Sequence, residues 1–449
     1  MISRLGLRRE DLSKTGEKRT ALVPDLVRII TQNGVPVIVQ PSEHPGTGEV
    51  KRAFTDEAYQ TAGAEINEDL DSAPVIFGLK EVDLDQILPD KVYLFFSHTH
   101  KGQVKNRPLL RKLMEQRVTL IDYELIANEQ GRIITAFTYF AGYAGMIDSL
   151  WTLSERWKLQ GVQGNVFQDI TQAITTEDLE KCKEQIRAAG ERIKTEGTPE
   201  SQPPLITVFL GNGKTSTGAQ SIYDLLPVQE ITLSELADTY QNGSRNQVYK
   251  LVMEVQDMYR LKEEAKPQFG HLAGNELAQL YYTEPQHFES NLDRVFPYAT
   301  KWMNCIIWSP EYPRLISRKQ AAEWYASHQT LQVIGDITCD PEGAIQFSQE
   351  TWIDQPVFVY APADNTSTIG MEGTGIAVMA VTNLPCEFSA DASEQFSQDF
   401  AQLLPGLVTA NYKADTVEAS GFPPTLRDAT ILWKGKLTEK YGYMGEFID

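Results

Sequence analysis

The sequence has little cysteine, no long apolar run and fewer basic than acidic side chains. Its four cysteines are spread along 449 residues, with no Cys-x-x-Cys pair and no histidine at ligand spacing. This usage is typical of reduced thiols in a cytoplasmic protein, and it predicts neither a metal site nor a disulfide framework. The N-terminus lacks an apolar signal segment, and no window approaches about 18 uninterrupted apolar residues. We therefore expect neither export nor a membrane span.

The excess of acidic side chains bears on the choice of partners. The chain carries 61 Asp+Glu against 41 Lys+Arg, a formal net charge of −20. This charge makes nucleic acid an unsuitable partner and points to small-molecule substrates. The hydrophobic share of 41% supports packed domains, two or three at this length. The oligomeric state stays open, with a dimer as one option.

The first 135 residues alternate short apolar runs with amphipathic helical patterns. The runs predict buried strands because they are short, rich in β-branched and aromatic residues and bounded by turn residues. These strands are expected at 36–40, 75–79, 92–96 and 118–122, with helices at 25–33, 56–62 and 107–115. Alternation of this kind predicts an α/β fold with a parallel sheet, whose ligands bind at the carboxyl ends of the strands.

A second α/β region is predicted after a long helix at 141–160 and a charged, proline-containing segment at 176–204. It begins with a strand at Leu205. Further strands are expected at 228–233, 303–308, 331–338, 356–361 and 375–381, and a charged helical stretch near 244–266. Residues 262–300 have no readable periodicity. The fold class predicted is thus two Rossmann-like α/β domains with parallel sheets.

A glycine-rich loop directly follows the strand that starts the second region. Gly211, Gly213 and Gly218 are spaced G-x-G-x-x-x-x-G, and Ser216 stands where a third glycine is usual. Glycines in this context allow a tight turn and a close approach of the backbone to a pyrophosphate at a helix N-terminus. The loop predicts dinucleotide binding, with a plain strand–turn–helix as the alternative.

Three further side chains could carry chemistry. Lys80 and His98 each follow a predicted strand, so both would project from the carboxyl edge of the sheet, where acid–base groups are useful. His100 competes with His98, and spacing does not decide between them. Arg19 precedes the helix-start residue Pro24 and could clamp a substrate carboxylate with its planar fork. Taken singly, each of these residues is more typical of a solvated or structural role than of a catalytic or binding one.

These motifs together resemble a known family. The strings GEKRTAL, VQPS, FGLKE, LFFSHTHKGQ, TLIDYELI and FAGYAGMI occur in the order seen in lysine–2-oxoglutarate reductase (saccharopine dehydrogenase, lysine-forming). The second half continues with FLGNGKTSTGAQSIYDLLP, MNCIIW, GDITCDPEGAIQF and EGTGIAVMAVTNLP, similar to the reductase half of the bifunctional aminoadipic-semialdehyde synthase. No saccharopine-oxidising half follows, which predicts a freestanding reductase.

The resemblance implies a fold shared with alanine dehydrogenase and transhydrogenase, in which the nucleotide domain is inserted into the catalytic domain. The expected catalytic and substrate domain is 1–140 plus 387–449, and the expected dinucleotide domain is 141–386. The implied enzyme is an oxidoreductase that condenses lysine with 2-oxoglutarate and reduces the imine to saccharopine with NAD(P)H, or runs the reverse reaction.

The resemblance also implies roles for individual residues. The catalytic pair falls on Lys80 and His98, and substrate binding on Arg19, Glu17 and Glu124. Cofactor binding falls on Gly211, Gly213, Ser216, Gly218, Asp336, Asp340, Asn383 and Leu384. The resemblance favours NADP(H) over NAD(H). Glu230, 19 residues after Gly211, could bind a ribose hydroxyl, but the sequence does not place it at a strand end.

Four departures from the family pattern leave the substrate less certain than the fold. Ile133 stands where the family usually has Arg, Phe137-Thr138 replaces the usual Phe-Gly, and Thr382 replaces an Asp. An insertion covers about 44–51. Two alternatives therefore stay open: an opine-type reductase for another amino acid and 2-oxo acid, and a catalytically silent nucleotide-binding relative.

Overall fold

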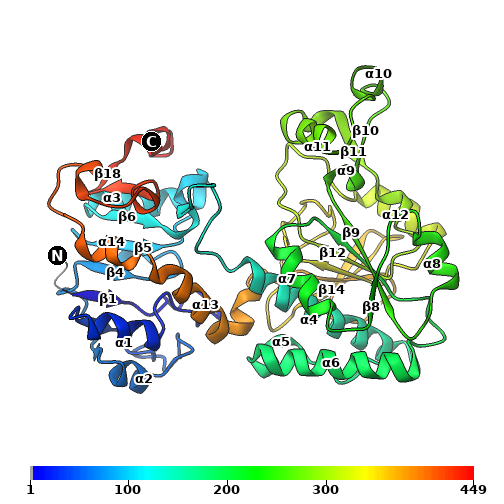
Figure 1. Cartoon of the computed structure of the whole chain (residues 1–449), viewed down its shortest axis with the longest axis horizontal. Coiled ribbons are helices and arrows are strands. Elements are labelled where there is room, and N and C mark those ends of the chain that lie inside the picture. Colours follow the sequence, from blue (N-terminus) through cyan, green and yellow to red (C-terminus); the bar gives the residue numbers. More distant parts are fainter. Residues whose placement is uncertain (1–3, 449) are drawn as a thin grey trace. The chain divides into compact units, whose positions relative to one another are not determined.

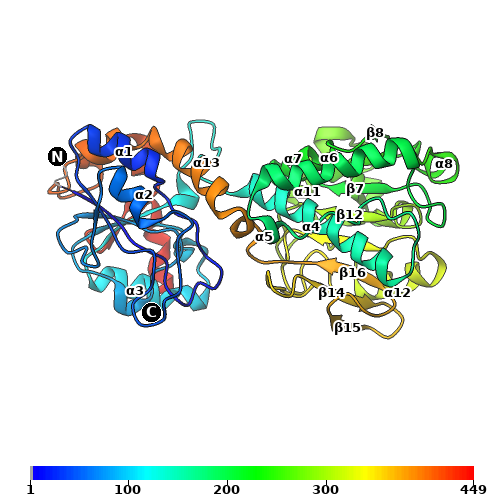
Figure 2. The same ribbon diagram turned by 90° about the horizontal axis from the view of Figure 1, so that it is seen from below.

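The computed structural model describes residues 4–448 and divides into two compact α/β units (Figure 1, Figure 2). The inserted unit is Thr138–Phe388, and the outer unit is formed by the chain up to Phe137 and from Ser389 onward. Each unit contains one eight-stranded, mostly parallel sheet. The predicted fold class is confirmed, including the insertion of one Rossmann-like unit into the other.

The outer unit joins the two ends of the chain in one sheet. Its strand order is β18-β17-β6-β5-β4-β1-β2-β3, and all neighbours are parallel except at β17 and β18. The strands are β1 (Leu5–Leu7), β2 (Val37–Val39), β3 (Glu65–Ile66), β4 (Val75–Phe77), β5 (Val92–Phe95), β6 (Thr119–Asp122), β17 (Thr430–Trp433) and β18 (Lys436–Leu437). The sequence had no prediction for β1, which lies between β2 and β4.

The helices of the outer unit follow from local sequence signals. In α1 (Pro24–Gln32), Pro24 occupies the first turn, where its missing N–H costs nothing, and Gly34 adopts φ +81° just beyond the C-cap. Its buried side chains pack on the sheet face that also carries α13 (Ser389–Ala401) and α14 (Leu404–Thr409). The opposite face carries α3 (Arg107–Glu115). A shorter helix, α2, spans Asp56–Thr61.

The inserted unit has the strand order β15-β14-β16-β13-β12-β7-β9-β8, antiparallel only at β14 and β15. The strands are β7 (Ile206–Leu210), β8 (Val228–Glu230), β9 (Val248–Met253), β12 (Lys301–Asn304), β13 (Val333–Asp336), β14 (Val357–Ala361), β15 (Thr366–Ile369) and β16 (Ile376–Met379). The longer helices are α4 (Thr138–Leu159), α6 (Leu179–Glu196), α7 (Lys214–Tyr223), α8 (Leu236–Asn242) and α12 (Arg318–Ser327).

One predicted element is wrong. Residues 248–253, expected to be helical, form β9, which is hydrogen-bonded to β7 along its length. The misleading residue is Lys250, whose charge suggests an exposed helix. Its Nζ lies 2.9 Å from Asp224 Oδ1 and 3.4 Å from Glu230 Oε2, so the lysine is neutralised within a buried strand. A strand at 248–253 then agrees with the β-branched and aromatic residues beside Lys250.

The segment that had no readable periodicity is a branch from the main sheet (Figure 1). Short α9 (Val255–Met258) follows β9, and β10 (Tyr259–Leu261) pairs antiparallel with β11 (Phe288–Ser290). Between them lie α10 (Lys266–Phe269) and α11 (Gly274–Thr283). No helix formed by residues 4–448 is both long and apolar enough to cross a membrane.

Candidate active site

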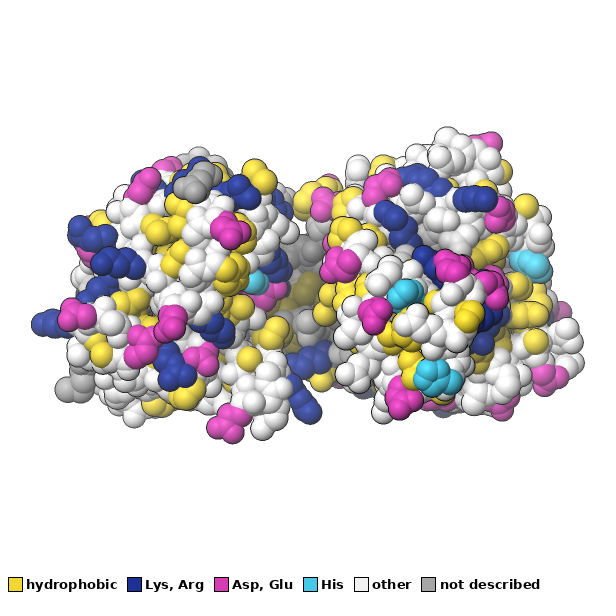
Figure 3. Space-filling view, turned by 90° about the horizontal axis from the view of Figure 1, so that it is seen from above, with side chains coloured by type: hydrophobic (Ala, Val, Ile, Leu, Met, Phe, Trp, Pro, Cys, Tyr) yellow, Lys and Arg dark blue, Asp and Glu magenta, His cyan; other side chains and the backbone are white. Residues whose placement is uncertain are grey.

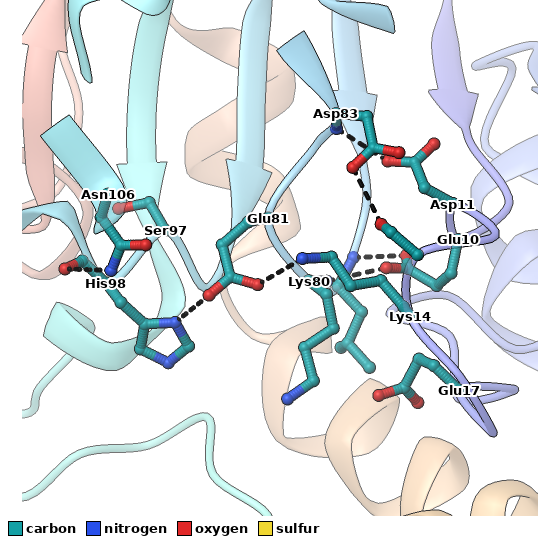
Figure 4. Close-up of polar contacts among 12 residues, drawn as sticks. Glu10, Asp11, Lys14, Glu17, Lys80, Glu81, Asp83, Ser97, His98 and Asn106 are labelled. Carbon is teal, nitrogen blue, oxygen red and sulfur yellow. Dashed lines mark hydrogen bonds and ion pairs between the residues drawn. The ribbon is translucent and has the colours of Figure 1, made fainter. Parts of the chain in front are cut away.

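The predicted acid–base residues lie at the carboxyl edge of the outer sheet (Figure 4). Lys80 follows β4 and His98 follows β5, and these two strands are parallel neighbours. The loop after β1, which pairs with β4 on its other side, runs past the same edge. Because parallel strands end at one edge, the topology brings together residues that are far apart in the sequence.

A buried carboxylate fixes the backbone at Lys80. The N–H groups of Leu79 and Lys80 donate to Glu10 Oε1 and Oε2 at 2.8 and 2.9 Å. Burial raises the pKa of Glu10 to about 7, against the opposing effects of Arg8 and the two N–H donors. Sequence reasoning missed Glu10. Its only signal is an acid close behind an N-terminal apolar run that had not been recognised as a strand.

A second acid orients His98. The Nδ1 of His98 lies 2.5 Å from Glu81 Oε1, and Lys14 Nζ donates to Glu81 Oε2 at 3.0 Å. Burial acts to raise the pKa of Glu81, but His98 and Lys14 outweigh it and hold that pKa well below its usual value. An ionised Glu81 accepts the Nδ1–H, which directs the lone pair of the neutral ring to Nε2. The sequence analysis missed Glu81, although it directly follows Lys80.

The insertion at about 44–51 supports the Glu81–His98 pair indirectly, through the loop that carries Lys14. It forms a turn closed by an antiparallel bridge between Glu43 and Val50. Lys51, at its end, is buried, and its Nζ donates to the backbone carbonyl of Lys14 at 3.0 Å. The inserted residues therefore help to hold the loop that carries Lys14, the partner of Glu81.

Arg19 and Glu17 form a buried ion pair. Arg19 Nε and Nη2 donate to the two oxygens of Glu17 at 2.8 and 2.6 Å, and the guanidinium lies 4.3 Å from the ring centre of Phe137. Burial alone would raise the pKa of Glu17, but Arg19, with a contribution from Lys80, lowers it. Arg19 is thus held rigidly by its neighbour, in contrast to the solvated arginine that was the alternative.

Glu124 belongs to a different cluster from Glu17. Its Oε1 lies 2.7 Å from Lys101 Nζ, and its Oε2 lies 3.6 Å from His100 Nε2. Beside them, buried Asp122 accepts hydrogen bonds from the backbone and hydroxyl of Ser97. Burial lowers the pKa of His100. The structure therefore separates the two histidines by partner: His98 faces Glu81, and His100 faces Asp122 and Glu124.

The position of the missing family arginine is on an exposed loop. Ile133 is 38% exposed and forms an antiparallel bridge with Ala127. The neighbouring Arg132 is exposed.

The glycine loop borders a hollow in the inserted unit. Gly211 adopts φ +99°, and a Cβ there would approach Ile306 to 3.0 Å. Gly213 caps α7, and a Cβ on it would meet nothing within 4 Å, because the glycine faces open space. The hollow has about 1040 Å³ of empty space, part of it open to solvent. The N–H groups of the first turn of α7, beside such a space, suit a pyrophosphate, so the residues fit a dinucleotide.

Other predicted cofactor residues have structural partners. A Cβ on Gly218 would lie 2.4 Å from the carbonyl oxygen of Tyr139, so this glycine permits the close crossing of α7 and α4. Ser216 is buried, and its hydroxyl accepts a hydrogen bond from Gln220. Neither residue lines the hollow.

The residues expected on the nicotinamide side lie near the ends of other strands. Asp336 ends β13, is buried and accepts from Asn304 Nδ2 at 2.7 Å and from Ser348 Oγ. Asp340 lies on the exposed loop that follows β13. Asn383 and Leu384 follow β16, with Leu384 buried.

Comparisons with known proteins agree with the predicted resemblance. Residues 6–144 match the family described as alanine dehydrogenase/PNT, N-terminal domain. Across 98% of its length, the chain is 35% identical to alpha-aminoadipic semialdehyde synthase of Arabidopsis thaliana and 30% identical to the mitochondrial protein of that name from Bos taurus. It spans only 41% and 47% of those two proteins. It is also 24% identical to the NAD(+), L-lysine-forming saccharopine dehydrogenase of Neurospora crassa, over 88% of both chains.

Solved structures support the fold. An L-alanine dehydrogenase aligns with a TM-score of 0.62 at 17% identity, covering 99% of this chain and 100% of that one. A transhydrogenase from Sinorhizobium meliloti aligns with a TM-score of 0.56 at 13% identity, over 97% and 100%. The predicted resemblance is confirmed: residues 6–144 are similar to the N-terminal domain of alanine dehydrogenase/PNT, and nearly the whole chain is similar to part of alpha-aminoadipic semialdehyde synthase.

Proposed function

We propose that the chain is an NAD(P)-dependent oxidoreductase of the saccharopine dehydrogenase (lysine-forming) type. It would condense the ε-amine of lysine with 2-oxoglutarate and reduce the resulting imine to saccharopine, or catalyse the reverse. The observation that carries the proposal is the Lys80–Glu81–His98 arrangement at one sheet edge, in a chain similar over 98% of its length to an aminoadipic semialdehyde synthase. The outer unit would bind the substrates, and the inserted unit the dinucleotide.

Lys80 and His98 supply the proton transfers. Imine formation requires the amine to lose a proton and the carbinolamine to lose water, and neither step is fast near neutral pH without positioned groups. His98, held through Nδ1 by Glu81, presents Nε2 to take up or return a proton. Lys80, on a backbone fixed by Glu10, is the second acid–base group. A positioned group of this kind contributes about 10²–10⁴-fold to the rate.

The remaining predicted residues bind and orient. Glu17 holds the Arg19 guanidinium over Phe137, which suits Arg19 to a substrate carboxylate, and Glu124 would contact substrate beside Lys101. Gly211 and Gly213 would receive the pyrophosphate. A dinucleotide bound at these glycines would supply the hydride for the imine carbon.

We propose that the nicotinamide end of the dinucleotide would lie near Asp336, Asp340, Asn383 and Leu384. Ser216 and Gly218 would act indirectly, by allowing α7 to pack.

A second candidate substrate pair has one observation in its favour. Ile133 cannot form the ion pair that the family arginine would supply, so another amino acid could replace lysine. A silent relative is disfavoured, because a protein without catalysis has no physical reason to hold His98 by an ionised acid beside Lys80.

The test is to incubate the purified protein with NADH or NADPH, 2-oxoglutarate and each common amino acid. Lysine-dependent loss of reduced-nicotinamide absorbance is expected. Consumption with a different amino acid would replace lysine by that substrate, and consumption with none would remove the oxidoreductase proposal. The family resemblance favoured NADP(H) over NAD(H), and the choice depends on the residues beside the glycine loop.

A further inference from the structure

The strand order of the inserted sheet identifies where an adenosine ribose would lie. In dinucleotide-binding sheets the ribose hydroxyls are read at the end of the strand next to the one that leads into the glycine loop. Here β7 leads into the loop and lies between β9 and β12. In the usual strand order 3-2-1-4 the ribose-binding strand is strand 2, on the side of strand 1 away from strand 4, and β9 occupies that side here, whereas β8 is the edge strand. The residue of interest therefore follows β9, although β8 comes first in the sequence.

That residue is Glu254. It directly follows β9 and lines the same hollow as Gly211 and Gly213. Asn212, between the two glycines, donates to Glu254 Oε1 at 3.3 Å, and Gln256 donates to Oε2 at 2.7 Å. The carboxylate is thus held at the glycine loop by two neutral donors, which leave its negative charge uncompensated.

The walls of the hollow supply no positive charge. Among the described residues that line it, none is Lys, Arg or His. The branch that follows β9 contributes apolar and aromatic surface instead, with Met258 on α9 and Tyr282 on α11. A 2′-phosphate placed here would meet a carboxylate and no cation.

Glu230, the acid that the sequence suggested, is placed elsewhere. It ends the edge strand β8, its side chain is 66% exposed, and its nearest charged neighbour is Lys250 Nζ at 3.4 Å. It does not line the hollow. The two acids therefore form a natural pair for a controlled test.

We infer that Glu254 makes the chain select NAD(H) against NADP(H). Its carboxylate would accept a hydrogen bond from the ribose 2′-hydroxyl and repel a 2′-phosphate. The inference rests on the proposed function only in placing a dinucleotide at the glycine loop. Like charges brought together at an interface strongly disfavour the wrong partner, so NADH should bind at least about tenfold more tightly than NADPH.

The test is direct binding, without substrates, followed by the change in nucleotide fluorescence for NADH and for NADPH. Glu254→Gln keeps the shape and one acceptor but removes the charge, and Glu254→Arg reverses it. The preference for NADH should narrow in the first variant and invert in the second. Glu230→Gln, the matched control, should leave both affinities unchanged.

The outcomes separate this inference from the proposed function. Equal or tighter binding of NADPH by the unaltered protein, or a shift of preference caused by Glu230→Gln, overturns the role of Glu254. Binding of NADH with the expected preference but no lysine-dependent oxidation leaves Glu254 in place and contradicts only the reaction. Circular dichroism of each variant identifies any loss of folding, and Glu254→Gln provides the decisive value if the arginine variant does not fold.

Discussion

The two units contain similar sheets but differ in how their ionisable side chains are partnered. In the outer unit the ionisable groups gather at the carboxyl edge and are held in pairs, such as Glu17 with Arg19 and Glu81 with His98. In the inserted unit the corresponding edge presents glycine backbone together with two acids, Asp336 and Glu254, which accept hydrogen bonds from neutral donors. Its most perturbed ionisable groups lie in the interior without an opposite charge, as at Lys301. On the face shown in Figure 3, acidic and basic side chains are interspersed over both units.

The difference indicates which chemistry each sheet edge supports. Paired charges hold acid–base groups in a fixed orientation, which proton transfer requires. Backbone N–H groups at a helix N-terminus bind a phosphate without committing a side-chain charge. Buried unpaired groups do neither, and they reduce stability because burial penalises their charged form. Four changes would break or sharpen this contrast.

The largest effect is expected at the paired edge of the outer unit. Lys80→Met and His98→Gln should each lower turnover by about 10²–10⁴-fold, because each removes a positioned proton donor or acceptor. Dinucleotide affinity should change little, as measured by fluorescence titration. His100→Gln is the control, since His100 faces Asp122 and Glu124 rather than Glu81, and its effect on turnover should stay below about tenfold. A larger loss at His100 than at His98 would reassign the catalytic histidine.

The next effect is expected at the glycine edge of the inserted unit. Gly213→Val places a side chain in the open space that a pyrophosphate would occupy. Loss of a hydrogen bond to a charged group costs about 1.5–3 kcal/mol, so affinity for NADH should fall roughly ten- to hundredfold while the fold is kept. Gly218→Ala serves as a contrast. Its Cβ would collide with the backbone of α4, so it should lower the unfolding temperature. Unchanged NADH affinity in Gly213→Val would remove the loop from the site.

A smaller effect is expected at the buried lysine of the inserted unit. Lys301 on β12 is fully buried, with Met146 Sδ at 3.3 Å from its Nζ and the Tyr223 ring at 5.3 Å. Burial holds the pKa of Lys301 well below its usual value. The unfolded chain therefore binds a proton that the folded chain does not, and stability rises with pH up to the ordinary lysine pKa. Lys301→Met should raise the free energy of unfolding by about 2 kcal/mol near pH 7, with a gain that shrinks toward pH 10.

Urea denaturation at several pH values measures this gain. The matched control is Lys250→Met on β9 of the same sheet, where the lysine is also buried but is paired with Asp224. That variant should be less stable than the unaltered protein. Stabilisation by both substitutions would show that the ion pair contributes nothing, and the contrast between paired and unpaired charge would fail.

The smallest effect is expected at a buried pair of acids. Asp148 on α4 and Glu387 after β16 each accept one backbone N–H, from Ala173 and Ile174. Each also has one buried oxygen with no hydrogen-bond donor among the described residues. Burial, with the two acids facing each other, raises the pKa of Glu387 well above its usual value, and burial also raises that of Asp148. The two carboxyls therefore share a proton.

The sign of the pH dependence follows from that shared proton. The folded chain keeps it where the unfolded chain has lost it, so stability is complete below about pH 4 and falls as pH rises toward the raised pKa. Glu387→Gln replaces the proton by a permanent N–H donor. The variant should gain about 1 kcal/mol over the unaltered protein at pH 8 and nothing at pH 4. Thermal unfolding curves that shift in parallel at every pH would show that the acids do not share a proton.

The sequence alone was sufficient for the elements with strong local signals. Short apolar runs bounded by turn residues predicted β2, β4, β5 and β6, and the glycine loop was identified by its place after a strand. Lys80, His98 and His100 were candidates because each follows such a run, and only the family resemblance favoured His98 over His100. The strand predictions depend on a few consecutive residues, and the structure confirms all four strands.

Only the tertiary structure showed what holds these residues and which acid adjoins the glycine loop. Glu10 meets Leu79 and Lys80 across about 70 positions of sequence because β1 is the neighbour of β4. Glu254 adjoins the glycine loop because β9, with its buried and neutralised Lys250, enters the sheet between β7 and β8. Strand order and ion pairing arise from packing between distant segments, and neither can be predicted from local periodicity.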